Sequence, residues 1–161
     1  MTKEKKMPLR PNVCMLVYNS RGHLWIGERF DKKGHWQFPQ GGVERGASLK
    51  ENVFRELREE LGLSRTAIGK IKKLKSCHSY LWKAIPDYAR GRWWGQSQTF
   101  WLVEFRGDDA DIDLAADRDQ EFRKWRWATV TAIRKLAAKE RRKGYEAPLK
   151  EFLELKRNRA L

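Results

Sequence analysis

The strongest constraint on the fold of this chain is an amphipathic helix that the sequence marks at both ends. Ser48 followed three residues later by Glu51 is typical of a capping box, and Gly62 stands where a helix commonly ends. The sequence therefore predicts a helix from Ser48 to Leu61. Its apolar side chains share one sector, which must pack against another layer of the protein; they are Val53, Phe54, Leu57 and Leu61.

Three carboxylates occupy the neighbouring sector of the same helix. Glu56, Glu59 and Glu60 stand at spacings that bring their Cβ atoms within about 5 to 6 Å, where like charges destabilise a helix unless a cation neutralises them. Carboxylate oxygens suit Mg²⁺ or Mn²⁺, which keep waters and substrate phosphates as their remaining ligands. An ordinary solvated acidic face explains the same spacing, so the helix alone leaves both interpretations open.

The residues around this helix resemble the signature of the Nudix hydrolases. That signature reads Gly, five residues, Glu, seven residues, then Arg-Glu-aliphatic-any-Glu-Glu-any-Gly-aliphatic. The matches in register are Gly41, Arg55, Glu56, Leu57, Glu59, Glu60, Gly62 and Leu63. The first Glu of the signature is Ala47 here, and in the family that Glu pairs with the signature Arg. We expect Glu51, four residues before Arg55, to supply part of the missing partner.

The resemblance covers almost the whole chain and is closest to one branch, the bacterial RNA pyrophosphohydrolases and dinucleoside polyphosphate hydrolases. The local matches are Arg10 to Val13, Trp36 to Gly42, Gly95 to Gln98, Glu121-Phe122, and Trp125 to Trp127. The resemblance implies a Nudix fold of the α/β class, an α/β/α sandwich with a mixed β-sheet.

The resemblance also implies roles for individual residues. Metal ligands would be Glu56, Glu59, Glu60, Glu121 and the carbonyl of Gly41, with Mg²⁺ as the cofactor and Mn²⁺ as an alternative. Arg55, Glu56, Glu60 and Glu121 would be catalytic, and spacing does not distinguish which of the three glutamates is the general base.

Substrate contacts are implied in the same way. Arg10 and Arg29 would face the phosphates, and Gln96 would line the same cleft. In the RNA-processing members a Lys of the last long helical segment also reaches the phosphates. The sequence does not single out one residue for that role from Lys139, Arg141, Arg142 and Lys143.

The expected function is Mg²⁺-dependent removal of pyrophosphate from the 5′-triphosphate end of RNA, which leaves a 5′-monophosphate and belongs to RNA 5′-end processing and mRNA decay. Hydrolysis of dinucleoside polyphosphates such as diadenosine tetraphosphate is the alternative, and a non-catalytic RNA-binding module is a third hypothesis. The formal net charge of +14 favours a polyanionic partner and argues against cationic substrates. Trp93 and Trp94, which follow Arg90 and Arg92, either stack on bases or pack internally.

Length and composition indicate one domain over residues 1–161, with Met1 to Pro8 as a flexible basic N-terminus. Two cysteines, Cys14 and Cys77, do not make a disulfide framework, so we expect buried thiols and a reducing cytoplasm. Apolar runs are too short for a membrane span or a signal segment, and no obligate protein partner is evident.

The remaining secondary structure is predicted from alternation and turn residues. A hairpin turn is expected at 19–22. Strands are expected at 12–18, 23–30, 68–80, 97–105 and 124–129, and further helices near Thr131 and from Ala147 to Lys156.

Overall fold

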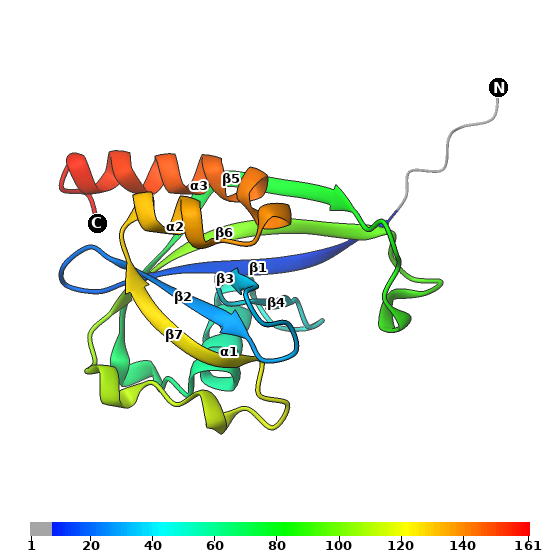
Figure 1. Cartoon of the computed structure of the whole chain (residues 1–161), viewed down its shortest axis with the longest axis horizontal. Coiled ribbons are helices and arrows are strands. Elements are labelled where there is room, and N and C mark those ends of the chain that lie inside the picture. Colours follow the sequence, from blue (N-terminus) through cyan, green and yellow to red (C-terminus); the bar gives the residue numbers. More distant parts are fainter. Residues whose placement is uncertain (1–7) are drawn as a thin grey trace.

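The computed structural model describes residues 8–161, in which one mixed sheet lies between helices (Figure 1). The strands are β1 Leu9–Tyr18, β2 Leu24–Arg29, β3 Trp36–Gln37, β4 Gln40–Gly42, β5 Ile68–Leu81, β6 Gly95–Phe105 and β7 Phe122–Ala128. The α-helices are α1 Leu49–Leu61, α2 Val130–Leu136 and α3 Lys139–Arg157. Short 3₁₀ segments lie at Arg65–Ala67, Asp87–Ala89, Asp109–Asp111 and Leu114–Ala116.

Strand β1 is the centre of the sheet. It runs parallel to β6 from the Leu9↔Gly95 pair to the Tyr18↔Glu104 pair, and antiparallel to β2 and β4. The strand order is β3-β2-β1-β6-β5, with β4 on β1 and β7 on β2. Both faces of β1 are covered, which explains why the run from Val13 to Tyr18 is continuously apolar.

Helices cover both faces of the sheet, and each face has its own apolar core. On one face Leu16, Phe100 and Phe38 of the sheet side pack with residues of α2 and α3; these are Ile133, Tyr145 and Phe152. On the other face the sheet packs against α1, whose buried apolar side chains are Val53, Leu57 and Leu61. The α/β/α sandwich expected from the sequence is confirmed.

Helix α3 is the element that the sequence predicted least well. It begins at Lys139 and not at Ala147, and Gly144 lies within it. Gly144 is required by packing and not by a turn: an added Cβ would lie 2.7 Å from Cδ2 of His78 on β5. This contact joins residues far apart in sequence, so local propensity did not indicate it.

Other expectations had mixed outcomes. The hairpin between β1 and β2 is present, with the amide of Asn19 donating to the carbonyl of His23 at 3.0 Å. Strands β3 and β4 were not predicted, since each spans only two or three residues. Cys14 is buried as expected, but Cys77 is exposed on β5, so that expectation was wrong. Residues 1–7 of the expected flexible N-terminus lie outside the described residues.

No helix within residues 8–161 combines the length and apolar character needed to span a membrane.

Candidate active site

The caps of α1 fix the position of the predicted carboxylates. The hydroxyl of Ser48 accepts from the amide of Glu51 at 3.1 Å, and the carboxylate of Glu51 accepts in return from the amide of Ser48 at 3.1 Å. Gly62 ends the helix in the left-handed region at φ 68°. Both predicted signals are therefore confirmed.

The three glutamates of α1 differ in burial. Glu56 and Glu60 are buried, with 7% and 4% of their surface exposed, whereas the side chain of Glu59 is half-exposed. Such burial of charged groups requires compensation by partners or protonation. The acidic sector of α1 is therefore not an ordinary solvated face.

Gly41 forms the wall against which Glu56 lies. It pairs with Val13 through the antiparallel β4–β1 ladder, and an added Cβ would lie only 2.0 Å from Cδ of Glu56. Only glycine allows this close approach of backbone and carboxylate. The structure thus brings together the first residue of the signature and its first helical Glu.

Arg55 holds the site through several acceptors. Its guanidinium donates to Oε1 of Glu56 at 2.8 Å and to Oε2 of Glu59 at 3.3 Å. It also donates to the carbonyl of Gly42 and to Oδ1 of Asn52, both at 2.8 Å. Arg55 therefore connects the helix to β4 and neutralises part of the acidic cluster.

The expected partnership of Glu51 with Arg55 is wrong. The carboxylate of Glu51 serves the capping box, whereas Oε2 of Glu44 lies 3.4 Å from Nε of Arg55. Asn52, which is fully buried, accepts from the amide of Glu44 at 2.8 Å and so positions this segment. Glu44 thus takes the place that the signature gives to position 47, where this chain has Ala47. Glu44 lies outside the helix, so helical spacing did not indicate it.

The buried carboxylates have raised pKa values. Burial raises the pKa of Glu56 to about 7, against the lowering effect of the Arg55 charge. Burial also raises the pKa of Glu60 well above its usual range, and the charges of Glu121 and Glu56 add to the increase. Glu121 lies just before β7 and has a raised pKa for the same principal reason, burial, although the Arg29 charge opposes it.

These residues fit a divalent cation in their chemistry. Oε2 of Glu60 is the only buried side-chain oxygen without a hydrogen-bond partner in residues 8–161. The charges of Glu121 and Glu56 help to raise the pKa of Glu60, and carboxylate oxygens are the hard donors that a divalent cation prefers. Within residues 8–161 no three acidic, His or Cys side chains converge on one point, and Arg55 binds Glu56 and Glu59. A cation here would therefore compete with Arg55 for these carboxylates.

The predicted phosphate contacts lie beside this cluster. The guanidinium of Arg10 lies against Gly42, where an added Cβ would be 2.2 Å from Nη2. Arg29, at the end of β2, is held by two hydrogen bonds of 2.8 Å to Asp31, and its charge acts on Glu121 and Glu60. Both arginines are thus near the acidic site, and their contact with phosphate stays a prediction.

Gln96 belongs to a buried amide network that the sequence only partly indicated. Its Oε1 accepts from Asn12 at 3.0 Å, and its Nε2 donates to the hydroxyl of Tyr80 at 2.7 Å. Gln98 donates to Asn12 at 3.0 Å and to Gln40 at 2.8 Å. Alternation along β6 places Gln96 and Gln98 on one face, which is the signal that could have found the network. The contact of Gln96 with a substrate stays a prediction.

The structure distinguishes the four basic residues at the start of α3. Lys139 and Lys143 are exposed, and Arg142 donates to the carbonyls of Ala137 and Lys135 at 2.8 Å. Arg141 instead turns toward the amide network, with contacts of 3.4 to 3.5 Å to Gln37, Gln40 and Tyr80. Its Nε is buried without a partner. Arg141 is therefore the cation that α3 directs toward the site.

Comparison with known proteins identifies the family of this chain. The sequence profile of the NUDIX domain family matches residues 8–148. This chain belongs to the Nudix family. The relatives support the expected branch: an RNA pyrophosphohydrolase of Wolbachia sp. subsp. Drosophila simulans is 34% identical over 154 residues, 92% of each chain. An RNA pyrophosphohydrolase of Sphingopyxis alaskensis is 34% identical over 158 residues, 94% of this chain and 98% of the other.

Solved structures of Nudix proteins share the fold at low identity. A Nudix hydrolase from Listeria monocytogenes superposes with a TM-score of 0.71 at 20% identity, covering 95% of this chain and 97% of the other. An Ap4A hydrolase of C. elegans superposes with a TM-score of 0.66 at 17% identity, covering 93% and 99%. These likenesses confirm the expected Nudix fold.

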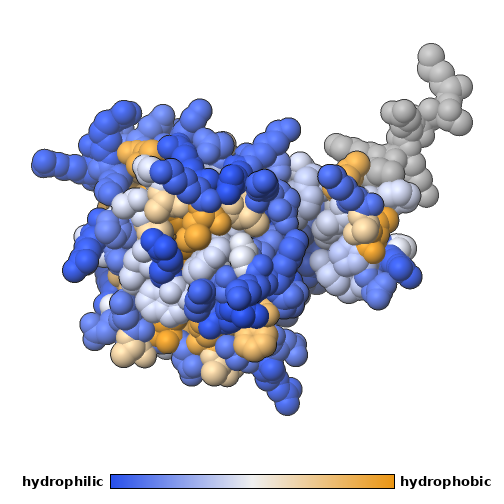
Figure 2. Space-filling view, viewed as in Figure 1, coloured by the Kyte–Doolittle hydropathy of each residue, from blue (hydrophilic) through white to orange (hydrophobic). Residues whose placement is uncertain are grey.

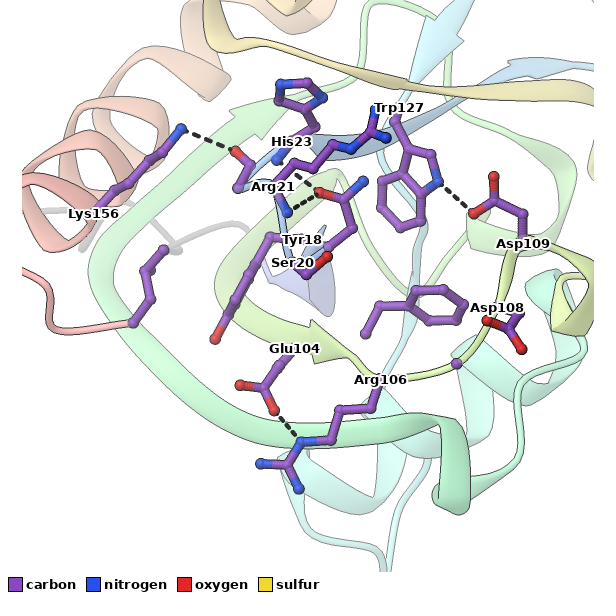
Figure 3. Close-up of a pocket in the computed structure, with 15 residues that line it drawn as sticks. Tyr18, Ser20, Arg21, His23, Glu104, Arg106, Asp108, Asp109, Trp127 and Lys156 are labelled. Carbon is purple, nitrogen blue, oxygen red and sulfur yellow. Dashed lines mark hydrogen bonds and ion pairs between the residues drawn. The ribbon is translucent and has the colours of Figure 1, made fainter.

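A cavity of about 970 Å³ in this Nudix protein lies away from the carboxylates. It is lined by the turn after β1, the end of β6 and the segment that follows, including Tyr18, Arg106 and Asp109 (Figure 3). Trp127 donates to Asp109 at 2.8 Å across it, and Lys156 reaches the carbonyl of Gly22 at 3.4 Å. None of the Nudix signature residues lines this cavity, so volume alone does not locate the candidate active site.

Proposed function

We propose that this Nudix hydrolase removes pyrophosphate from the 5′-triphosphate end of RNA and leaves a 5′-monophosphate, a step in RNA 5′-end processing and mRNA decay in the cytoplasm. The observation that carries the proposal is the set of the buried carboxylates Glu56 and Glu60 and the half-buried Glu121, whose charges act on one another, with arginines beside them. The relatives that are named RNA pyrophosphohydrolases support it over most of the chain. In this proposal residues 1–161 form a single Nudix domain.

The proposed cofactor is Mg²⁺, with Mn²⁺ as the alternative. Glu56, Glu59, Glu60, Glu121 and the carbonyl of Gly41 would hold it, and the unpartnered Oε2 of Glu60 is the observation in favour. When bound, the cation supplies charge neutralisation for phosphate oxygens and a more acidic water.

The side chains of this chain have separable roles in the proposal. Burial raises the pKa of Glu56 in the cation-free protein, and Glu56 is one candidate for the general base that takes the proton of the attacking water. Glu60 and Glu121 remain candidates for the same role, because burial raises the pKa of each. Arg55 orients Glu56 through its 2.8 Å hydrogen bond. Arg10, Arg29 and Arg141 would bind the phosphates, and Gln96 would support the cleft wall.

A comparison of substrates tests this function. Purified protein with Mg²⁺ is given triphosphorylated RNA and diadenosine tetraphosphate at equal concentrations, and the released pyrophosphate and mononucleotides are measured. The proposal predicts that kcat/KM for the RNA is higher by about tenfold or more, because the net charge of +14 favours the longer polyanion. Fast cleavage of the dinucleotide with no attack on the RNA would assign the alternative function.

A second measurement addresses a non-catalytic RNA-binding module. Glu56→Gln should reduce turnover by a factor of about 100 or more if Glu56 is the general base, while RNA affinity changes little. Wild-type protein that binds RNA and shows no turnover of either substrate would support the binding module.

A further inference from the structure

The connection from the end of β5 to the start of β6 forms a small lobe beside the start of β1. We call residues 81–94 the aromatic lobe. The ladder continues past the Leu81↔Gly95 pair, with the amide of Trp82 donating to the carbonyl of Trp94 at 3.0 Å. The amide of Trp94 donates to the carbonyl of Pro8 at 3.0 Å, which ties the lobe to the segment before β1. Figure 1 shows this green lobe projecting at the right, away from α2 and α3.

The aromatic lobe exposes large apolar side chains on an ordered frame. Tyr88 and Trp94 expose 54% and 47% of their surface, and Leu81 exposes 57%. The frame includes a 3₁₀ turn at Asp87–Ala89, and the carbonyl of Ala89 accepts from the amides of Arg92 and Trp93, both at 3.0 Å. Figure 2 shows orange hydrophobic atoms beside blue hydrophilic ones on this lobe. Exposed aromatic side chains within one short segment indicate an interaction surface.

The charge of the aromatic lobe favours a polyanion. Its sequence holds Lys83, Arg90 and Arg92 against the single acidic residue Asp87. The guanidinium of Arg92 lies 4.2 Å from the centre of the Trp93 ring. Cations interleaved with flat aromatic rings suit single-stranded nucleic acid, whose bases stack and whose phosphates need positive charge.

Arg10 connects the aromatic lobe to the candidate active site. Its guanidinium lies 4.9 Å from the centre of the Tyr88 ring and 5.7 Å from that of Trp93. The same guanidinium lies against Gly42, the residue after the Gly41 that contacts Glu56. Arg10 therefore spans the distance between the candidate active site and the aromatic lobe. An RNA strand whose first phosphates bind at the carboxylates would meet the lobe directly after Arg10.

We propose that the aromatic lobe binds the unpaired RNA nucleotides that follow the reacting 5′ end, with bases stacked on Tyr88 and Trp94. The backbone phosphates of those nucleotides lie near Lys83, Arg90 and Arg92. The direction of the RNA rests on the proposed function, whereas the affinity of the lobe for RNA does not. The lobe thereby favours 5′ ends with several unpaired nucleotides over short substrates.

Length-dependent kinetics test this inference. Trp94→Ala and Tyr88→Ala are each compared with wild type on a triphosphorylated dinucleotide and on a triphosphorylated unstructured 12-nucleotide RNA. The ratio of KM for the longer RNA to KM for the dinucleotide should rise about tenfold, since stacking on an aromatic ring contributes roughly 1 to 3 kcal/mol per base. Trp94→Phe should restore most of the wild-type ratio. Leu153→Ala, which removes an exposed apolar side chain from α3, is the matched control and should leave the ratio unchanged.

Two kinetic outcomes would overturn the inference. An unchanged KM ratio in both variants means that RNA does not contact the rings. An equal loss on both substrates means that the lobe only supports the site. A wild-type dimer that Trp94→Ala converts to a monomer in sedimentation would also overturn it, because the rings would then be a contact between copies.

A binding experiment separates this inference from the proposed function. Fluorescence anisotropy is measured with a labelled 12-nucleotide RNA that carries a 5′-hydroxyl and therefore has no triphosphate. Tyr88→Ala and Trp94→Ala should each weaken its binding about tenfold. Unchanged binding in both variants would overturn the inference that the aromatic lobe binds RNA. If wild type binds this RNA through the aromatic lobe but hydrolyses no triphosphorylated RNA, the proposed function fails. The inference that the lobe binds RNA would still hold.

Discussion

Glu60 is a candidate cation ligand that lowers the stability of the cation-free protein. Its carboxyl group is buried with one oxygen unpartnered, and burial raises its pKa well above the usual 4.5. A folded-state pKa above the unfolded value means that the folded protein binds the proton more tightly. The stabilising contribution is full below pH 4.5 and is lost as pH rises through the folded-state pKa. At neutral pH Glu60 therefore costs stability in the protein without a bound cation.

Glu60→Gln should consequently stabilise the cation-free protein at pH 8. The free energy of unfolding should rise by about 1 kcal/mol or more at pH 8, with no gain near pH 4, because the amide needs no deprotonation. Urea denaturation at the two pH values measures this difference. Turnover should fall about 100-fold in the same variant if Glu60 binds the cation or takes the proton. A loss of stability at pH 8 would contradict the interpretation.

Gly41 and Gly42 allow a comparison of neighbouring positions. Gly41→Ala should displace the Glu56 carboxylate, since an added Cβ would meet it at 2.0 Å, and kcat should fall about 100-fold. Gly42→Ala should instead displace the guanidinium of Arg10 and raise KM, with a smaller effect on kcat. Steady-state kinetics of both variants provide the check. Similar kcat losses in both would show that loop distortion, not the specific contacts, is responsible.

At the scale of elements, α1 was predictable because its signals are local. Ser48, Glu51 and Gly62 determine its ends through contacts within four residues, and the structure reproduces both ends. The partner of Arg55 was not predictable in this way, because Glu44 reaches it from the loop before the helix. The start of α3 was missed for a related reason. Gly144 packs against His78, which is distant in the sequence. Candidate metal ligands were predicted from the signature and, for Glu121, from the local match at Glu121-Phe122, whereas Arg141 and the amide network required tertiary contacts.

The two acidic residues near Arg55 should therefore have different effects. Glu44→Gln should reduce kcat several-fold, because the pair with Nε of Arg55 at 3.4 Å is lost, while stability changes by less than about 0.5 kcal/mol. Glu51→Gln should weaken the capping box and lower stability by about 0.5 to 1 kcal/mol with little change in kcat. Thermal unfolding and initial rates distinguish them. The reverse pattern would restore Glu51 as the partner of Arg55.

For the whole molecule, the charge of +14 determines how binding responds to salt. Each phosphate contact releases counterions, so a few contacts weaken RNA binding about tenfold between 50 and 200 mM salt. We expect KM for a 12-nucleotide triphosphorylated RNA to rise by that factor, and KM for the triphosphorylated dinucleotide to rise less. Initial rates over the salt series measure both. Equal salt dependence of the two substrates would place all phosphate contacts at the reacting end.

Helix α3 also holds the segment between β3 and β4 in a way that can be observed directly. The hydroxyl of Tyr145 accepts from the amide of Phe38 at 3.0 Å, and this amide lies three residues before Gly41. The exchange of that amide with deuterium therefore reports whether α3 is docked on the sheet. Tyr145→Phe removes the acceptor and should speed the exchange about fivefold or more, since one hydrogen bond contributes about 1 kcal/mol. A single amide thus gives a solution signal for the docking of α3 on the segment between β3 and β4.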